Sequence, residues 1–201
     1  MGKIVCLMGK SSSGKDTIYK KLLAQKEVVL RAIVPYTTRP IREGEREGVE
    51  YHFTDEAGFQ ELCSRGSVIE DRTYHTCLGM WRYFTVADDA VDLLHNDYVM
   101  IGTLEAYTKM QRFYGEEKVL AVMIDLDDGE RLQRALDRER AQGDPKYEEM
   151  CRRFLADAED FAEEKLKGAG IDRTFRNDKV DRCLNEILTY LQEKLADRAG
   201  R

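Results

Sequence analysis

Residues 8–17 read MGKSSSGKDT, and the interpretation of the rest of the chain starts from this stretch. Gly9, Gly14 and Lys15 fit the spacing G-x-x-x-x-G-K of a phosphate-binding loop. Glycines let backbone N–H groups curl around phosphate oxygens, and the following helix points its positive end at them. The lysine then neutralises the outer phosphates. An apolar run precedes the loop and an amphipathic run follows it, which is the strand–loop–helix context that the pattern requires.

Asp16 occupies the position where this pattern usually carries a Ser or Thr that binds Mg²⁺. Three interpretations are open: the carboxylate binds Mg²⁺ itself, it turns away as an acid in the first helical turn, or the metal-dependent function is lost. Thr17 still offers a hydroxyl, and Ser11, Ser12 and Ser13 add donors. We favour a working site in which Asp16 is an altered metal ligand.

Composition limits the class of protein. The chain has 201 residues, 42% of them hydrophobic and 35% charged, which predicts one soluble globular domain. A net charge of -6 argues against nucleic acid and against an anionic membrane as partners. The five cysteines have no C-x-x-C spacing, which favours reduced thiols in a cytoplasmic protein. No apolar run approaches the length of a membrane span.

Apolar runs of strand length alternate with longer amphipathic segments, which predicts a doubly wound α/β fold. The runs are continuous, as in a parallel sheet that helices cover on both faces. Strands are predicted at 3–8, 29–34, 98–102 and 118–124, with a short fifth at 174–176. Helices are predicted at 15–26, 104–114, 128–142, 146–167 and 179–196.

Two regions interrupt this rhythm. Residues 36–95 hold short strand-like segments at 50–53 and 67–74 and a helix near 55–65, which indicates a small inserted lobe. A later Arg-rich region, broken by Gly143 and Pro145, suits a mobile hairpin of two helices that acts as a lid. The predicted division is a core of 1–35, 96–137 and 168–201, an acceptor-binding lobe of 36–95 and a lid of about 138–167.

The lobe begins with YTTRPIREGEREGVEYHF, residues 36–53. Arg39 and Arg42 lie three residues apart, and Tyr51 follows a glycine-containing turn. Two guanidiniums and a phenol can converge on one phosphate through bidentate and single hydrogen bonds. The alternative for such a stretch is a solvated, charged loop.

TTRP-x-R-x-GE, then G-x-x-Y-x-F, then VIE, all downstream of the phosphate loop, resemble guanylate kinase over about residues 3–195. The resemblance implies a P-loop nucleoside-monophosphate kinase with a parallel-sheet core, a monophosphate-binding lobe and a closing lid. Such an enzyme moves the γ-phosphoryl of ATP onto GMP with Mg²⁺. Its partners are small-molecule nucleotides, with neither nucleic acid nor membrane, and a homodimer is left open.

Acceptor contacts follow from the resemblance. Arg39, Arg42 and Tyr51 are the expected ligands of the GMP phosphate, and Glu45 is expected to support the arginines. Glu70, in VIE, is the expected guanine reader. Guanine presents N1–H and N2–H₂ side by side, and a carboxylate accepts from both, whereas adenine lacks that pair of donors. The alternative for Glu70 is a surface acid on a strand edge.

The resemblance also implies lid arginines on the transferring phosphoryl group, where developing charge needs stabilisation. Arg138 and Arg153 match best, Arg134 is a further candidate, and Arg140 could replace Arg138. With Lys15 these are the expected catalytic residues. The expected ATP-binding residues are Gly9, Ser11, Ser12, Ser13, Gly14, Lys15, Asp16, Thr17 and Asn177, the last resembling a residue that helps to hold adenine.

Departures from the family pattern cluster in the acceptor pocket. Gly102 and Leu104 stand where the family usually has two acids, although Glu105 is close enough to compensate. A second phosphate-binding Tyr aligns with Leu78, just before Gly79, and we keep Gly79 as an acceptor-site residue. The hydroxyl that follows this glycine in the family aligns with Met80, and the substitutes left open are Thr76, Tyr74 and Tyr83.

These departures leave two alternatives to phosphorylation of GMP or dGMP. One is a kinase of the same architecture for another phosphorylated acceptor, such as another nucleotide or a sugar phosphate. The other is a non-catalytic guanylate-kinase-like module that binds phosphopeptides. Such modules have usually lost the loop lysine and the lid arginines, both of which this chain keeps.

Overall fold

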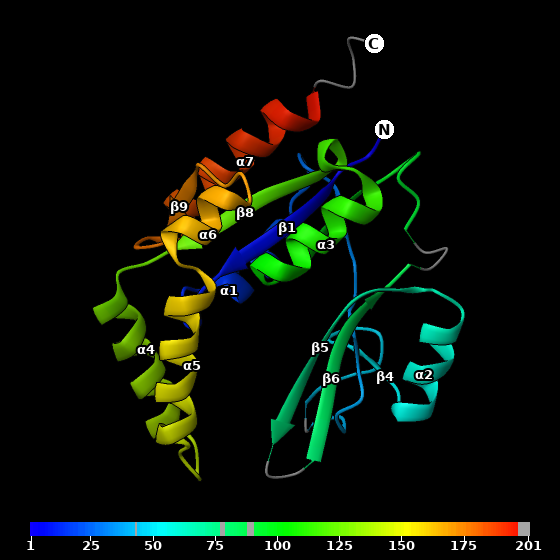
Figure 1. Ribbon diagram of the computed structural model, residues 1–201. Coiled ribbons are helices and arrows are strands. Elements are labelled where there is room, and N and C mark those ends of the chain that lie inside the picture. The colour runs from blue at the N-terminus through cyan, green and yellow to red at the C-terminus, as the bar shows by residue number, and fades with distance from the viewer. Residues whose placement is uncertain (43, 77–78, 88–90, 197–201) are drawn as a thin grey trace.

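The computed structural model describes residues 1–42, 44–76, 79–87 and 91–196. Its core is a parallel five-stranded sheet (Figure 1). In spatial order the strands are β2 (Leu30–Ala32), β7 (Asp97–Ile101), β1 (Ile4–Gly9), β8 (Val119–Asp125) and β9 (Thr174–Arg176). Every residue of β1 is buried, as expected for a central strand whose two faces are covered. All five core strands predicted from the sequence are confirmed within two residues.

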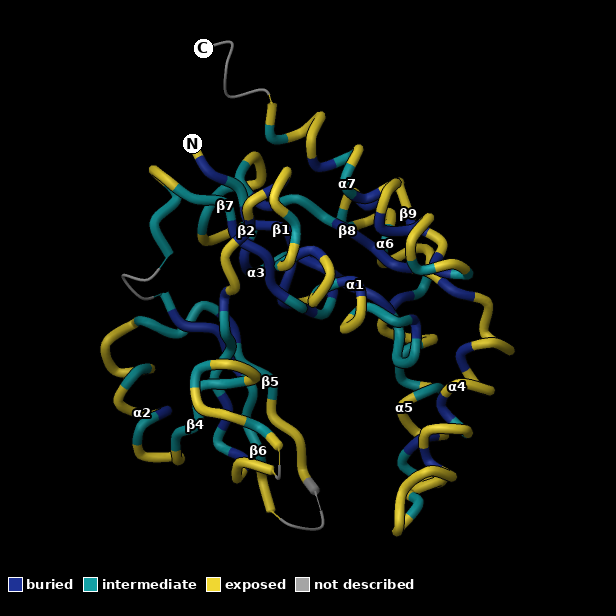
Figure 2. Tube along the Cα trace, turned by 180° about the vertical axis from the view of Figure 1, so that it is seen from behind, coloured by how far each residue is buried: buried dark blue, intermediate teal, exposed yellow. Residues whose placement is uncertain are grey.

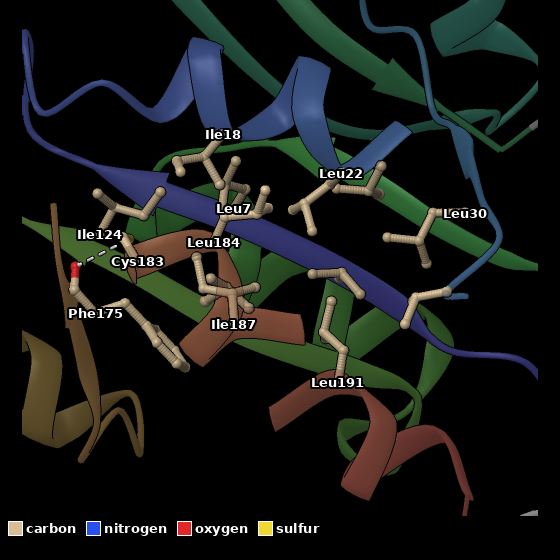
Figure 3. Close-up of a cluster of buried hydrophobic side chains, with 14 residues drawn as sticks. Leu7, Ile18, Leu22, Leu30, Ile124, Phe175, Cys183, Leu184, Ile187 and Leu191 are labelled. Carbon is tan, nitrogen blue, oxygen red and sulfur yellow. Dashed lines mark hydrogen bonds between the residues drawn. The ribbon is translucent and has the colours of Figure 1, made fainter. Parts of the chain in front are cut away.

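Helices cover both faces of this sheet, which confirms the doubly wound α/β fold. Helices α1 (Lys15–Leu23) and α7 (Val180–Ala196) pack on one face through the apolar cluster shown in Figure 3. Helices α3 (Leu104–Tyr114) and α6 (Glu163–Gly168) pack on the other face. The 3₁₀ turn η1 (Glu116–Lys118) leads into β8.

A second sheet forms a separate layer beside the core (Figure 1). Its strand order is β4 (His52–Phe53), β3 (Tyr36–Thr37), β6 (Gly79–Val86) and β5 (Val68–Thr76). Helix α2 (Glu56–Ser64) covers one face, where Phe59 packs against Phe84 and Val86. Strand β6 was not predicted, although its alternation is clear in hindsight: Phe84 faces α2, and Tyr83 and Thr85 face the other side.

Helices α4 (Asp128–Arg140) and α5 (Tyr147–Asp160) form the predicted helical hairpin. It projects from the core in the same general direction as the β5–β6 hairpin and lies across from it, and much of its surface is exposed (Figures 1 and 2). The predicted single helix over 146–167 is wrong, because the chain breaks at Phe161 and resumes as α6. Phe161 is buried in the core cluster beneath α3, and Leu166 packs against that cluster. We propose that the lid ends near Asp160.

Candidate active site

The phosphate loop has the backbone that its glycines predict. Gly14 has φ +86°, a left-handed conformation that L side chains rarely adopt, and it directly precedes α1. At Gly9, a Cβ atom would lie 2.7 Å from Ser13 Oγ and 2.8 Å from Ile124 O. Both positions therefore require glycine, and the loop closes tightly over the end of β1.

Asn177 lies beneath the loop. Its side chain is fully buried, and Nδ2 donates to the Ser13 carbonyl at 2.7 Å. Its own backbone N–H donates to Asp125 O, so the residue is fixed at the ends of β8 and β9. A Cβ atom on Gly14 would lie 2.4 Å from Asn177 Nδ2. In this structure Asn177 therefore positions the phosphate loop, and its expected contact with adenine stays a prediction.

The loop opens into a polar cavity of about 450 Å³. Its lining comes from the loop and the start of α1 on one side and from the lid on the other. The lining residues are Ser11, Ser12, Gly14, Lys15, Asp16, Thr17, Arg134, Arg138 and Arg153. The structure thus brings all four expected catalytic residues to one cavity. Four cations and one acid around this cavity favour a polyanionic ligand.

The cavity suits a nucleoside triphosphate with bound Mg²⁺. The hydroxyls of Ser12 and Ser13 are buried and have no hydrogen-bond partner among the residues that the structure describes, and the positive end of α1 faces the loop. Asp16 and Thr17 are exposed on the first turn of α1 and line the same cavity. A carboxylate and a hydroxyl are ligands that Mg²⁺ accepts alongside phosphate oxygens. Across the described residues, no three His, Cys, Asp or Glu side chains gather as a metal site of their own.

The lid arginines differ in how they are held. Arg153 Nε donates to Glu149 Oε1 at 2.7 Å, and Arg152 shares the same carboxylate through two further hydrogen bonds. The hydrogen bonds from these two arginines lower the pKa of Glu149 to about 2. Arg134 lies 3.7 Å from Glu130. Glu149 therefore aligns Arg153 toward the cavity and stays ionised at neutral pH.

A buried ion pair between the two lid helices, which also binds the loop backbone, was not foreseen from the sequence. The side chain of Arg131, on α4, is only 1% exposed, and its Nε donates to the Ser11 carbonyl at 3.0 Å. Its Nη2 donates to Asp157 Oδ2, on α5, at 3.1 Å, and its guanidinium also contacts Asp128 and the ring of Phe154. Asp157 in turn accepts from the Ser11 N–H at 2.7 Å. The loop backbone is thus clamped from both lid helices.

The predicted phosphate cluster of the lobe assembles around Arg39. This residue is 3% exposed and makes two hydrogen bonds to Glu45, of 2.8 and 2.5 Å. Its guanidinium lies 5.1 Å from the ring of Tyr51, and its buried Nε has no hydrogen-bond partner. Arg42 is exposed, and its backbone N–H donates to Glu45 at 2.8 Å. A buried guanidinium with an unsatisfied donor fits an incoming phosphate.

Glu70 lies on the edge strand β5, but its side chain is buried rather than exposed at the surface. Its side chain is 0% exposed, and a β-bulge just before it shifts the register so that Glu70 pairs with Thr85 of β6. Thr85 Oγ1 donates to Glu70 Oε1 at 2.8 Å, and Arg72 Nε donates to Oε2 at 3.2 Å. The lobe thus presents a carboxylate that is held in place by two donors.

Tyr83 and Thr85 lie beside these acceptor groups. Tyr83 lies 5.6 Å, ring to ring, from Tyr51, and its hydroxyl helps the Glu45 hydrogen bond to raise the pKa of Arg39. Tyr83 was only an alternative in the sequence, and Thr85 was not considered there. Gly79 instead pairs with Thr76 at the hairpin tip, about 20 Å along the strand from Thr85. The structure does not bring Gly79 to the pocket, and Leu78 lies outside the described residues.

Packing explains the missing acids after β7. At Gly102, a Cβ atom would lie 2.8 Å from the buried Sγ of Cys6, so a larger side chain would require Cys6 to shift. Leu104 is buried in the core cluster under α3. Glu105 is exposed and pairs with Lys109 one helical turn away at 2.7 Å. This end of the sheet therefore supplies sulfur and methyl groups where the resemblance implies carboxylates.

The burial of the Cys6 thiol can be tested by measuring how the stability of the protein changes at alkaline pH. Burial raises its pKa from 9.0 to about 12, Glu70 adds to the rise, and Arg72 opposes it. Below pH 9.0 both folded and unfolded chains keep the proton; above it only the unfolded chain releases it. The free energy of unfolding is expected to fall by about 1.4 kcal/mol per pH unit from this thiol.

Urea unfolding at about pH 8 and about pH 10.5 measures this dependence. In the Cys6→Ala variant, the free energy of unfolding is expected to fall less steeply with pH, by about 1.4 kcal/mol per pH unit, whatever the absolute stability of the variant. An unchanged slope in Cys6→Ala would show that other groups carry the alkaline destabilisation.

Comparisons with known proteins agree with this geometry. The guanylate kinase family model matches residues 1–194. A guanylate kinase of Anaplasma phagocytophilum (strain HZ) is 30% identical over 202 residues, covering 100% of this chain and 84% of the relative. A guanylate kinase of Wolbachia sp. subsp. Brugia malayi (strain TRS) is 28% identical, covering 99% and 96%.

The fold agrees as well. The crystal structure of guanylate kinase from Anaplasma phagocytophilum superposes with a TM-score of 0.65 at 23% identity, covering 96% of this chain and 86% of that one. At this identity the likeness speaks for the fold alone. The family model, however, spans nearly the whole sequence, and the relative with 30% identity covers all of it. The chain therefore belongs to the guanylate kinase family.

Proposed function

We propose that this protein transfers the γ-phosphoryl group of ATP to GMP or dGMP, giving ADP and GDP or dGDP. One observation carries the proposal: a cavity that joins the phosphate loop to three lid arginines, in a chain whose lobe holds the Arg39 cluster and the buried Glu70. The first element suits a triphosphate, and the second and third suit a guanine monophosphate.

Each group has a role in the transfer. The amides of the phosphate loop and Lys15 hold the phosphates of ATP. Arg134, Arg138 and Arg153 stabilise the charge that develops on the transferred group. Asp16 is the residue that would hold Mg²⁺, which would supply neutralisation of the phosphate charge there. No side chain need act as a general base, because positioning and charge stabilisation dominate this chemistry.

The lobe holds the acceptor. Arg39, Arg42 and Tyr51 bind its phosphate, with Glu45 fixing Arg39. Glu70 accepts from N1–H and N2–H₂ of guanine. Closure of the lid brings its arginines onto the reacting phosphates and excludes water, which limits wasteful hydrolysis of ATP.

Replacing Glu70 by glutamine tests this assignment. Glu70→Gln is nearly isosteric but turns one acceptor into a donor that faces the guanine donors. We expect kcat/KM for GMP to fall by about 100-fold or more, since a site built for hydrogen bonding loses strongly when partners are unmatched. ADP release is measured with Mg²⁺-ATP against GMP, dGMP, AMP, CMP, UMP and several sugar phosphates.

Glu56→Gln is the matched control. Glu56 also pairs with an arginine, Arg82, but on the face of the hairpin that α2 covers. Its substitution is expected to leave GMP turnover within about twofold. If the unaltered protein turns over no guanine nucleotide, the proposed function is wrong, and activity with another acceptor would identify its substrate class.

Two finer expectations accompany the proposal. We place the protein in the cytoplasm, where nucleotides and Mg²⁺ are available, with small nucleotides rather than nucleic acid as partners and a homodimer left open. No helix in the described part of the chain is long and apolar enough to cross a bilayer.

A further inference from the structure

Arg72 stands between the two halves of the acceptor pocket. It lies on β5 two residues after Glu70, directly opposite Tyr83 of β6. Its side chain is 21% exposed, whereas that of Glu70 is 0% exposed, so the guanidinium is the more accessible member of this ion pair. The positive charge of Arg72 lowers the pKa of both Cys6 and Tyr51, in each case against a larger rise from burial. Arg72 therefore lies close to the proposed base site and to the phosphate cluster at once.

The proposed base site holds few charged groups, so the charge of Arg72 has a large effect on which base can bind there. Position 102 holds glycine against Cys6, and position 104 holds a buried leucine, so the end of β7 adds no carboxylate. Arg72 contributes a cation next to the one acid that remains. A pocket of one carboxylate and one guanidinium suits a base edge that carries both donors and acceptors.

Guanine has such an edge. Its donors N1–H and N2–H₂ are followed directly by the acceptors O6 and N7, and a bidentate arginine on O6 and N7 is the commonest specific contact to this base. Arg72 uses Nε and Nη2 toward Glu70, at 3.2 and 3.5 Å. Within the described residues, its Nη1 donates to no other group. Thr85 has a single hydroxyl proton, which it gives to Glu70, so Thr85 does not compete for O6 in this arrangement.

We propose that Arg72 is a specificity-determining residue that donates to O6 and N7 of the acceptor base while Glu70 accepts from N1–H and N2–H₂. This inference rests on the proposed function and names the residue that replaces the missing acids in base selection. Adenine would present its N6 amine where O6 stands in guanine and would set donor against donor. Arg72 thus selects for guanine by repulsion as well as by attraction.

Single-atom changes in the acceptor test the proposal. 6-Thio-GMP weakens the acceptor at position 6, and 7-deaza-GMP lacks the acceptor at position 7, while both keep N1–H and N2–H₂. For the unaltered protein we expect kcat/KM to favour GMP over each analogue by about 10-fold or more. In Arg72→Met, kcat/KM for GMP is expected to fall by about 10- to 100-fold, and the preference over each analogue to shrink to about twofold.

The preference for GMP over the two analogues, rather than the rate with GMP, distinguishes direct recognition of the base by Arg72 from mere support of Glu70. If Arg72 only holds Glu70 in place, Arg72→Met lowers turnover of GMP and both analogues alike, and the unchanged preference overturns the proposal. Arg72→Lys keeps a positive charge beside Glu70 but loses the planar fork. It is expected to abolish the preference over at least one analogue, and intact preferences over both would also overturn the proposal.

Arg82→Met is the matched control. Arg82 lies on the same hairpin in an ion pair with Glu56, Nε to Oε2 2.9 Å, but on the opposite face. Its substitution is expected to leave both preferences unchanged. Absence of GMP turnover in the unaltered protein would overturn the proposed function and this inference together. Turnover of GMP with no preference over the two analogues would overturn this inference alone.

Discussion

Lys15→Met is expected to lower kcat by about 1000-fold, a loss of about 4 kcal/mol of transition-state stabilisation. Lys15 is the first residue of α1 and lines the cavity between the loop and the lid arginines. Methionine keeps the length and the apolar stem of the side chain but removes the charge, so the loop keeps its shape and loses its cation. Steady-state rates of ADP release at saturating ATP and GMP measure the effect.

The control for Lys15→Met is Lys20→Met, an exposed position on the same helix outside the cavity. It is expected to change kcat by less than about twofold. Binding of ATP, measured separately by calorimetry, should weaken far less in Lys15→Met than kcat falls, because the charge acts most on the transition state. Retention of more than about a tenth of kcat would contradict the role of Lys15.

Arg131→Met is expected to cost about 3–5 kcal/mol in the free energy of unfolding. Arg131 is nearly fully buried, and the substitution leaves Asp157 without its charge partner and the Ser11 carbonyl without a donor. Removing one partner of a buried ion pair is much more costly than replacing both. Urea unfolding followed by circular dichroism gives the value.

Asp157→Leu and the double variant with Arg131→Met complete a thermodynamic cycle. We expect the double variant to be more stable than the sum of the two single losses predicts, by about 1–3 kcal/mol, because no lone charge remains buried. Arg65→Met, in an exposed i,i+4 pair with Glu61, serves as the surface control and should cost less than about 1 kcal/mol. Additive losses at Arg131 and Asp157 would show that the pair is not coupled.

The core could be predicted from the sequence because its signals are local. Each core strand is a continuous apolar run, and each neighbouring helix carries an apolar stripe, so both kinds of element can be recognised without knowing the fold. The break at Phe161 was missed because charged residues with helical propensity continue on both sides of it. Only the folded core shows that Phe161 and Leu166 pack against the sheet while α5 projects away from it. Strand β6 was missed although its composition and its alternation favour a strand; what the sequence does not show is its pairing with β5.

The residues of the site also fall into those that lie in local sequence patterns and those that only the fold brings together. The phosphate loop and the Arg39 cluster are contiguous patterns, so their residues could be proposed from the sequence, with Glu45 added by the resemblance. Thr85 depends on the register of the β5–β6 hairpin and on the bulge before Glu70, and neither can be counted from one sequence. The Arg131–Asp157 pair joins residues on two helices that meet only in the fold. An arginine and an aspartate in such charged helices look like solvated surface residues until their burial is known.

The position of β1 in the sheet has a consequence for synthesis on the ribosome. This first strand is wholly apolar in its packing, yet its hydrogen-bonding partners are β7 and β8, with Ile4 paired to Tyr98 and Val119. At 5–20 residues per second, β1 waits roughly 5–20 s for its first partner strand. Asn177, which fixes the phosphate loop, emerges later still. The nascent chain therefore carries an unpaired aggregation-prone strand for about half of its translation, and a holdase chaperone bound there would act before any nucleotide can.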